Sequence, residues 1–155
     1  MLVYRIERKK YLRTTLRGIG AASSSGFRWN SLHSHMVYTS ESKALAMLEI
    51  SVHLDIAESL PSDRYFLDID IPDTLTILEL LVQGLPSTWN SKPPLKQSQL
   101  IGDDFLFRNE AAILKVPSSI IPTESNFLIN PFHPDSNKIK VINKELIIFD
   151  QRLYK

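Results

Sequence analysis

Three side chains between residues 26 and 50 are of types that could do chemistry together, although the sequence separates them. Arg28 lies beside Trp29 at the end of a Gly/Ser-rich stretch, and its guanidinium would suit phosphate because the planar donor fork matches phosphate oxygens. Tyr38 ends an apolar run and could stack on a flat ring. Glu49 is a carboxylate in an apolar helical pattern. Each also has an ordinary explanation, such as a solvated loop arginine or a tyrosine at the rim of the core.

The surroundings of Glu49 make it the most informative of the three. Leu45, Leu48 and Val52 stand at positions i, i+3 and i+7 of a stripe that would face the core, and Glu49 fills the i+4 place. A carboxylate there is at least partly desolvated, so it needs a compensating hydrogen bond. It would either reach solvent or an arginine at the margin of the stripe, or point into a pocket as a functional group. The helical pattern leaves both interpretations open.

Other patterns carry weaker chemical signals. His33 and His35 form an HxH pair that would face one side of a strand, but no third metal ligand stands out, so we expect no metal site. The stretch GIGAASSSG contains a GxG without the strand–GxGxxG–helix arrangement of a dinucleotide-binding fold. Its serines lack the GxSxG surroundings of a hydrolase nucleophile.

Several polar residues are best explained by structure. Asp68 and Asp70 share one face of a predicted strand, which we interpret as a solvated face. Asn126, Asn130 and His133 are polar in a region that otherwise looks buried, and we interpret them as side chains that bond to loop backbone.

The elements that must position these residues follow from periodicity and turn signals. A helix is predicted from an N-cap at Ser40 to the residue before Pro61, and a second over residues 97–109. Residues 17–29 read as a loop, and residues 73–81 as a short helix or turn. Strands are predicted at 2–6, 35–39, 64–71, 111–116 and 127–131, followed by a terminal hairpin of 138–142 and 145–150. Strands dominate, so the fold class is α+β with a mixed or antiparallel sheet.

The whole chain has the size and balance of one globular domain. It has 155 residues, of which 43% are hydrophobic and 23% charged, and its formal net charge is +1. We therefore predict a single domain over residues 1–155, with no overall charge that draws it to nucleic acid. The absence of cysteine excludes disulfides and thiolate metal sites. No run approaches the roughly 20 apolar residues of a membrane helix, and no secretory signal is expected. We therefore expect a cytoplasmic location.

Several short motifs together resemble the RES domain. They are GFRWNS, VYTSESKALAMLE, LPSTW, IGDDFL, ILKVPSSIIPTESNFLINPFHPD and FDQRL, and they extend over nearly the whole chain. One departure is SGFRW, because the family more often has two glycines before the arginine. RES proteins are toxins of bacterial toxin–antitoxin pairs, and their fold is similar to that of ADP-ribosyltransferase toxins. The family's arginine, tyrosine and glutamate fall on Arg28, Tyr38 and Glu49, and its serine falls on Ser118, with Ser119 as the adjacent alternative.

The resemblance implies that NAD+ is a substrate, cleaved between nicotinamide and ribose, and that no cofactor is needed. Glu49 would stabilise the positive charge that develops on the ribose, and Tyr38 would stack on nicotinamide. Arg28 would clamp the pyrophosphate, Ser118 would donate a hydrogen bond to phosphate or ribose, and Trp29 would line the site. The alternatives are a mono-ADP-ribosyltransferase that modifies a host protein, and an inactive RES-like domain that only binds partners.

The resemblance also implies a protein partner. This would be an Xre-family antitoxin in a hetero-oligomeric complex, with a homodimer of the chain as a further option within that complex. The chain itself shows no helix-turn-helix that would read DNA, so contact with DNA is expected only through the antitoxin.

Overall fold

The computed structural model describes residues 1–54 and 60–153, and its framework is one seven-stranded sheet in the order β4-β5-β6-β2-β1-β3-β7. All neighbours in the sheet are antiparallel except β4 and β5, which are parallel. The predicted α+β class with a mixed sheet is confirmed. The strands are β1 Leu2–Arg8, β2 Val37–Ser40, β3 Arg64–Asp70, β4 Ile77–Glu79, β5 Ile113–Pro117, β6 Ser125–Ile129 and β7 Lys140–Leu146.

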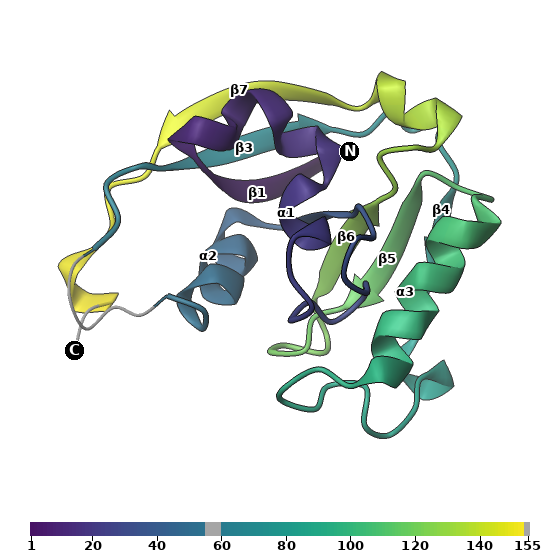
Figure 1. Ribbon diagram of the computed structural model, residues 1–155. Coiled ribbons are helices and arrows are strands. Elements are labelled where there is room, and N and C mark those ends of the chain that lie inside the picture. The colour runs from purple at the N-terminus through teal and green to yellow at the C-terminus, as the bar shows by residue number, and fades with distance from the viewer. Residues whose placement is uncertain (55–59, 154–155) are drawn as a thin grey trace.

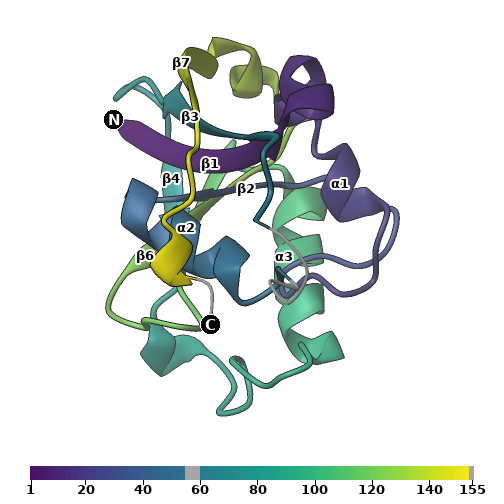
Figure 2. The same ribbon diagram turned by 90° about the vertical axis from the view of Figure 1, so that its left-hand side faces the viewer.

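Short helices connect and cover these strands. Among the described residues, the α-helices are α1 Ile19–Ala22, α2 Lys43–Ser51 and α3 Lys96–Arg108, and the 3₁₀ helices are η1 Lys9–Arg17, η2 Val82–Gly84, η3 Pro134–Lys138 and η4 Gln151–Leu153. Figure 1 shows β7, β3 and β1 running across the top of the molecule, while β6, β5 and β4 descend on the right with α3 beside them. Figure 1 also shows α2 and α3 well apart, and Figure 2, turned by 90°, shows β2 running below β1 and above α2.

Two apolar clusters fill the opposite faces of the sheet. Val3, Leu67 and Ile69 belong to one cluster, which Leu12 and Leu16 of η1 cover. Trp29, Trp89 and Phe105 belong to the other, which lies under α3. Successive residues of β5 and β6 belong alternately to the two clusters, because side chains alternate between the faces of a strand and both faces are buried here. The second cluster supports the segment that carries Arg28.

The helix predicted from Ser40 begins later and ends earlier than expected. Ser40 is the last residue of β2, and Ser42 is the N-cap, because its Oγ accepts a hydrogen bond from the Leu45 backbone N–H at 3.0 Å. The helix ends at Ser51, and residues 55–59 of the predicted span lie outside the described residues. Val52 is 55% exposed, so the predicted core stripe is wrong at that position.

Two predictions near the sheet edges are also wrong. Ile77–Glu79 forms β4, a strand parallel to β5, where a short helix or turn was expected, because the edge of β5 offers it backbone partners. The terminal hairpin does not form: Lys140–Leu146 is one strand along β3, and residues 147–150 are not a strand. The predicted loop at 17–29 contains α1 and follows η1.

The structure tests our interpretations of three groups of polar residues: the HxH pair, Asp68 and His133. The HxH pair lies before β2 and not on a strand, because His33 has a positive φ of 73°. Asp68 is not simply solvated, because it pairs with Lys43 of α2 at 3.1 Å and its side chain is 17% exposed. His133 does bond to loop backbone, since its Nδ1 accepts from the Asp135 N–H at 3.0 Å.

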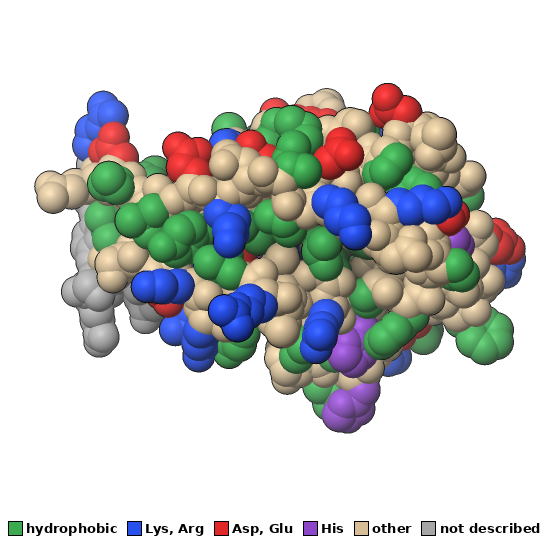
Figure 3. Space-filling model, turned by 90° about the horizontal axis from the view of Figure 1, so that it is seen from above, with side chains coloured by type: hydrophobic (Ala, Val, Ile, Leu, Met, Phe, Trp, Pro, Cys, Tyr) green, Lys and Arg blue, Asp and Glu red, His purple; other side chains and the backbone are tan. Residues whose placement is uncertain are grey.

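On one face of the protein, most side chains of opposite charge lie in different parts of the surface. In the view of Figure 3, Lys and Arg side chains gather on one side of the visible face, and Asp and Glu side chains along the other. No helix in the described part of the chain has the length and apolar character of a membrane span.

Candidate active site

A cleft of about 880 Å³ opens beside α2, within the size range of small-molecule sites. Its walls come from β1, β2, β6 at Asn126, α2 with the two residues after it, the loop before β2, residues 92–94 and residues 119–120. Arg28, Trp29, Tyr38 and Glu49 all line this cleft. Ser118 does not line it, whereas Ser119 does. The fold therefore brings the arginine, the tyrosine and the glutamate to one site.

Glu49 lies on the last turns of α2 and is held by the neighbouring strands. Its Oε1 accepts a hydrogen bond from Ser118 Oγ at 2.7 Å and a second from Asn126 Nδ2 at 2.8 Å. The side chain is half-buried, so these donors compensate part of the lost hydration. Glu49 therefore lines a pocket, and neither of its two hydrogen-bond partners is an arginine. Its functional role stays a prediction.

Tyr38 presents its ring to the cleft and buries its hydroxyl. The hydroxyl donates to Asn30 Oδ1 at 2.7 Å and accepts from the Trp29 backbone N–H at 3.1 Å. Burial raises the pKa of Tyr38 far above its ordinary value, so the phenol stays protonated at neutral pH. The Phe27 ring lies 5.1 Å from the Tyr38 ring and extends the aromatic surface. Tyr38 can therefore stack on a planar group, but it cannot serve as a base at neutral pH.

Arg28 is a partly enclosed cation and not a solvated loop arginine. Its Nη1 donates to the backbone carbonyls of Trp89 and Ser91, each at 2.9 Å. Burial lowers the pKa of Arg28, while the nearby charge of Glu49 opposes that change, and an arginine remains charged under all ordinary conditions. Within the described residues, Nε and Nη2 make no hydrogen bond. This half of the guanidinium fork is free to meet a phosphate.

Helix α3 fixes the loop that carries Arg28. Gln99 Nε2 donates to the carbonyls of Ser25 and Phe27, at 2.8 and 2.9 Å. Asp103, one turn further on the same face, accepts from the backbone N–H of Ser31 at 2.9 Å. Between them Gly102 lets the helix approach so closely that a Cβ there would lie 1.6 Å from the Trp29 carbonyl oxygen. The IGDDFL motif therefore acts on the site by positioning this loop.

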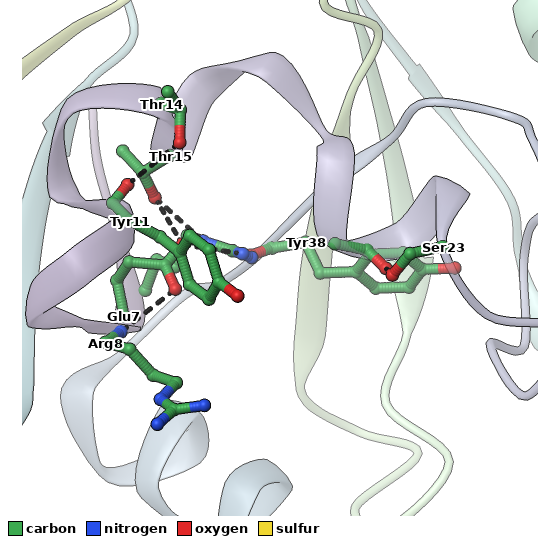
Figure 4. Close-up of polar contacts among 9 residues, drawn as sticks. Glu7, Arg8, Tyr11, Thr14, Thr15, Ser23 and Tyr38 are labelled. Carbon is green, nitrogen blue, oxygen red and sulfur yellow. Dashed lines mark hydrogen bonds and ion pairs between the residues drawn. The ribbon is translucent and has the colours of Figure 1, made fainter.

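A second brace joins β1 to the backbone of Tyr38. Arg5 lies on β1 and donates from Nη1 to the Tyr38 carbonyl at 2.9 Å, from Nη2 to Glu7 at 3.0 Å and from Nε to Thr15 at 3.0 Å. Figure 4 shows Glu7 and Thr15 close together on one side, with the Tyr38 ring pointing away from them. Arg5 lines the cleft, but its charge is already paired with Glu7. Arg28 is therefore better placed than Arg5 to bind a phosphate.

We expect Tyr38→Phe to destabilise the protein although the ring is kept. The change removes the hydroxyl that satisfies Asn30 Oδ1, and Asn30 is completely buried, so its oxygen would be left without that donor. Leaving a buried polar group unsatisfied costs about 1–3 kcal/mol in the free energy of unfolding. Urea denaturation of the variant and the wild type measures this loss. Equal unfolding midpoints would contradict the bracing role of the hydroxyl, and Tyr65→Phe, for which no hydroxyl contact occurs among the described residues, is the control.

Two predicted site residues, Ser118 and Trp29, are almost wholly buried, and of the two only Trp29 lines the cleft. Ser118 is fully buried, and its Oγ accepts from the backbone N–H groups of Ile120 and Ile121 while it donates to Glu49. It lies behind the carboxylate, so a direct bond to NAD would require this network to rearrange. Trp29 is 3% exposed, and its ring stacks on Trp89 with centroids 6.2 Å apart.

Sequence reasoning missed several residues that hold the site. Asn126 was interpreted as bonding to loop backbone, and this is wrong, because its side chain reaches Glu49 and Ser40. Asn30 and Gln99 were not singled out, and both are buried polar residues. For Asn126, the available signal was a polar residue in an apolar strand. This signal identifies a role for the residue only when its partners in other parts of the chain are known.

Comparisons with known proteins show similarity along nearly the whole chain. The family model of the RES domain matches residues 2–150. A Prs ADP-ribosylating toxin of Sphingobium sp. (strain YBL2) is 38% identical over 147 residues, which cover 94% of this chain and 90% of that protein. A Toxin Res of Photorhabdus laumondii is 36% identical over 157 residues, which cover 100% of this chain and 98% of that protein.

A solved structure shows the same fold at low identity. A chain in the crystal structure of the M. tuberculosis MbcT–MbcA toxin–antitoxin complex matches with a TM-score of 0.75 and 19% identity, over 94% of this chain and 83% of that one. The fold expected from the resemblance is thereby confirmed. With the family model matching nearly the whole length and relatives well above 30% identity along it, the chain belongs to the RES domain family.

Proposed function

We propose that this protein is a toxin that consumes NAD+ by breaking the bond between nicotinamide and ribose. The observation that carries the proposal is Glu49, whose Oε1 is fixed by two donors in the cleft that Arg28 and Tyr38 also line. Relatives named Toxin Res and Prs ADP-ribosylating toxin support it, since ADP-ribosylation draws its ADP-ribose from NAD+.

The geometry suits a bond cleavage through an oxocarbenium-like transition state. Positive charge develops at the ribose C1′ as the electron pair of the bond leaves with nicotinamide, and a fixed carboxylate stabilises that charge. Nicotinamide departs as a neutral ring, so no acid is needed to protonate it. In this proposal Glu49 Oε2 faces the ribose, the Tyr38 ring stacks on nicotinamide, and Arg28 binds the pyrophosphate through Nε and Nη2. NAD+ is then a substrate, and no metal or cofactor takes part.

The acceptor of ADP-ribose decides between two reactions. If water attacks C1′ and loses a proton, the products are nicotinamide, ADP-ribose and H⁺, and the protein is an NAD+ glycohydrolase. If a side chain of another protein attacks, ADP-ribose becomes attached to that protein. The name of the Sphingobium relative favours keeping this second reaction as the alternative. An inactive RES-like domain is the third reading, and it predicts no nicotinamide at all.

Incubation of the purified protein with NAD+ tests the proposal. We expect free nicotinamide to accumulate, and chromatography of the mixture then shows whether an equal amount of free ADP-ribose accompanies it. Mass spectrometry of a bacterial lysate treated with the protein and NAD+ shows any protein that gains ADP-ribose. No nicotinamide in either setting would refute the enzymatic proposal and leave a binding module.

The proposal includes a partner that restrains the enzyme in the cytoplasm. A free NAD-consuming enzyme would arrest its own host, so we propose a complex with an Xre-family antitoxin, through which the protein would reach DNA. The structural neighbour, taken from a toxin–antitoxin complex, supports a partner of this kind. A homodimer of the chain within that complex is part of the same proposal.

A further inference from the structure

We propose that Asn126, itself oriented by Ser40, is a positioning residue that sets the direction of the Glu49 carboxylate for the reaction. This inference rests on the proposed function, because it assigns a role within that same site. Asn126 is not among the residues that the resemblance places in the site, and its role follows from its contacts alone.

The contacts form a relay across two strands. Ser40 ends β2 and pairs directly with Asn126 on the antiparallel strand β6. Ser40 Oγ donates to Asn126 Oδ1 at 2.8 Å, and Asn126 Nδ2 donates to Glu49 Oε1 at 2.8 Å. Both bonds have ordinary lengths for charge-neutral and charge-assisted pairs. The relay joins the end of one strand to the carboxylate of α2.

The chemistry of the three groups allows only one direction for this relay. An ionised carboxylate can only accept, so the amide must turn its NH₂ group towards Glu49. The amide oxygen then faces Ser40, whose hydroxyl supplies the proton. Without the Ser40 hydroxyl, nothing described holds the amide oxygen on that side. Ser40 therefore acts on Glu49 through Asn126.

The two donors meet on one oxygen of Glu49, and this decides which oxygen serves the substrate. Ser118 Oγ and Asn126 Nδ2 both reach Oε1, which has two acceptor positions. In the part of the chain that the structure describes, no group donates to Oε2. The last torsion of a glutamate has a broad, weak preference, so a single bond would leave the carboxylate free to turn. Two bonds, one from the residue that follows β5 and one from β6, hold Oε1 back and keep Oε2 towards the cleft.

Of the two donors to Glu49, Asn126 can be replaced with less disturbance to other contacts than Ser118. Ser118 Oγ additionally accepts from two backbone N–H groups of the following turn, so its removal disturbs that turn. The Asn126 side chain contacts only Ser40 and Glu49 through hydrogen bonds among the described residues. A loss of rate in an Asn126 variant therefore reports on the carboxylate more directly.

The experiment compares nicotinamide release by the wild type, Ser40→Ala, Asn126→Ala, Glu49→Gln and the double variant of Asn126 and Glu49. We expect kcat of Asn126→Ala to fall about 10- to 100-fold, because a small misplacement of a reacting group costs up to about 10²-fold, while KM for NAD+ stays within about threefold. In the double variant, the loss should equal that of Glu49→Gln alone, since groups that act as a unit are not additive. Asn143→Ala is the matched control, because the exposed Asn143 donates to Asp68 at 3.3 Å and neither residue lines the cleft.

The outcomes separate this inference from the proposed function. A wild type that releases no nicotinamide overturns both. An active wild type with an equally active Asn126→Ala overturns the positioning role alone, and so does a double variant in which the two losses multiply. Unfolding temperatures of all variants are measured alongside, and a fall in kcat of Asn126→Ala at an unchanged unfolding temperature, with Ser40→Ala intermediate, supports the relay.

Discussion

Replacing Glu49 by glutamine is expected to reduce nicotinamide release about 10²- to 10⁴-fold while the protein keeps its fold. The amide has the shape of the carboxylate, and its oxygen can still accept from Ser118 and Asn126. Its NH₂ group then takes the place of Oε2 in the cleft. A donor there faces the developing positive charge on the ribose, and the stabilising negative charge is gone. The rate of nicotinamide release at saturating NAD+ measures the effect.

The control for this prediction is Glu41→Gln, which changes an exposed glutamate just before α2 that does not line the cleft. We expect its rate to match the wild type. If Glu49→Gln released nicotinamide at a rate near that of the wild type, the carboxylate would have no role in bond cleavage. Growth arrest by the expressed protein should follow the same order among these variants.

The second large effect is expected from Gly102→Ala, which changes a residue outside the cleft. The new methyl group would lie 1.6 Å from the Trp29 carbonyl oxygen and 2.6 Å from its carbon, both backbone atoms that cannot turn aside. Helix α3 must move away from the loop that carries Arg28, and overpacking of this kind costs about 1–3 kcal/mol or more in the free energy of unfolding. Thermal unfolding measures the loss.

Activity should fall along with stability in this variant. The same shift loosens the bonds from Gln99 and Asp103 to the loop, so Arg28 loses its fixed position. Gly84→Ala is the matched control, because a Cβ there meets nothing within 4 Å, and we expect a change within about 0.5 kcal/mol. A Gly102→Ala protein as stable as this control would show that α3 does not fix the loop through close contact.

The sequence indicated the residues that meet in the cleft better than it indicated the residues that support them. Arg28, Tyr38 and Glu49 have side chains whose chemistry is visible from residue type, and the motif order placed them in one family. Their supports depend on partners from distant parts of the chain: Asn126 is 77 residues from Glu49, and Asp103 is 72 residues from Ser31. Local periodicity carries no information about such pairs.

The errors in the fold have the same origin. The terminal hairpin was predicted from two β-rich runs, but Lys144 between them stays paired with Leu67, so Lys140–Leu146 continues as one strand and residues 147–150 lie outside it. Ile77–Glu79 became a strand because β5 offers it a parallel partner, which no local signal shows. Helix α2 begins after Ser42 because Ser40 remains in the sheet as the partner of Asn126. In each case, pairing with a neighbouring strand of the sheet outweighs the conformation that the local sequence favours.

The most direct test of the central claim is a crystal structure of Glu49→Gln with intact NAD+. This variant should bind the substrate without cleaving it. The account predicts that the pyrophosphate lies at Nε and Nη2 of Arg28, that nicotinamide stacks on the Tyr38 ring, and that the ribose C1′ faces the side chain of residue 49. NAD+ bound outside this cleft, or bound with its adenine end against residue 49, would contradict the claim that these three residues form the site of cleavage.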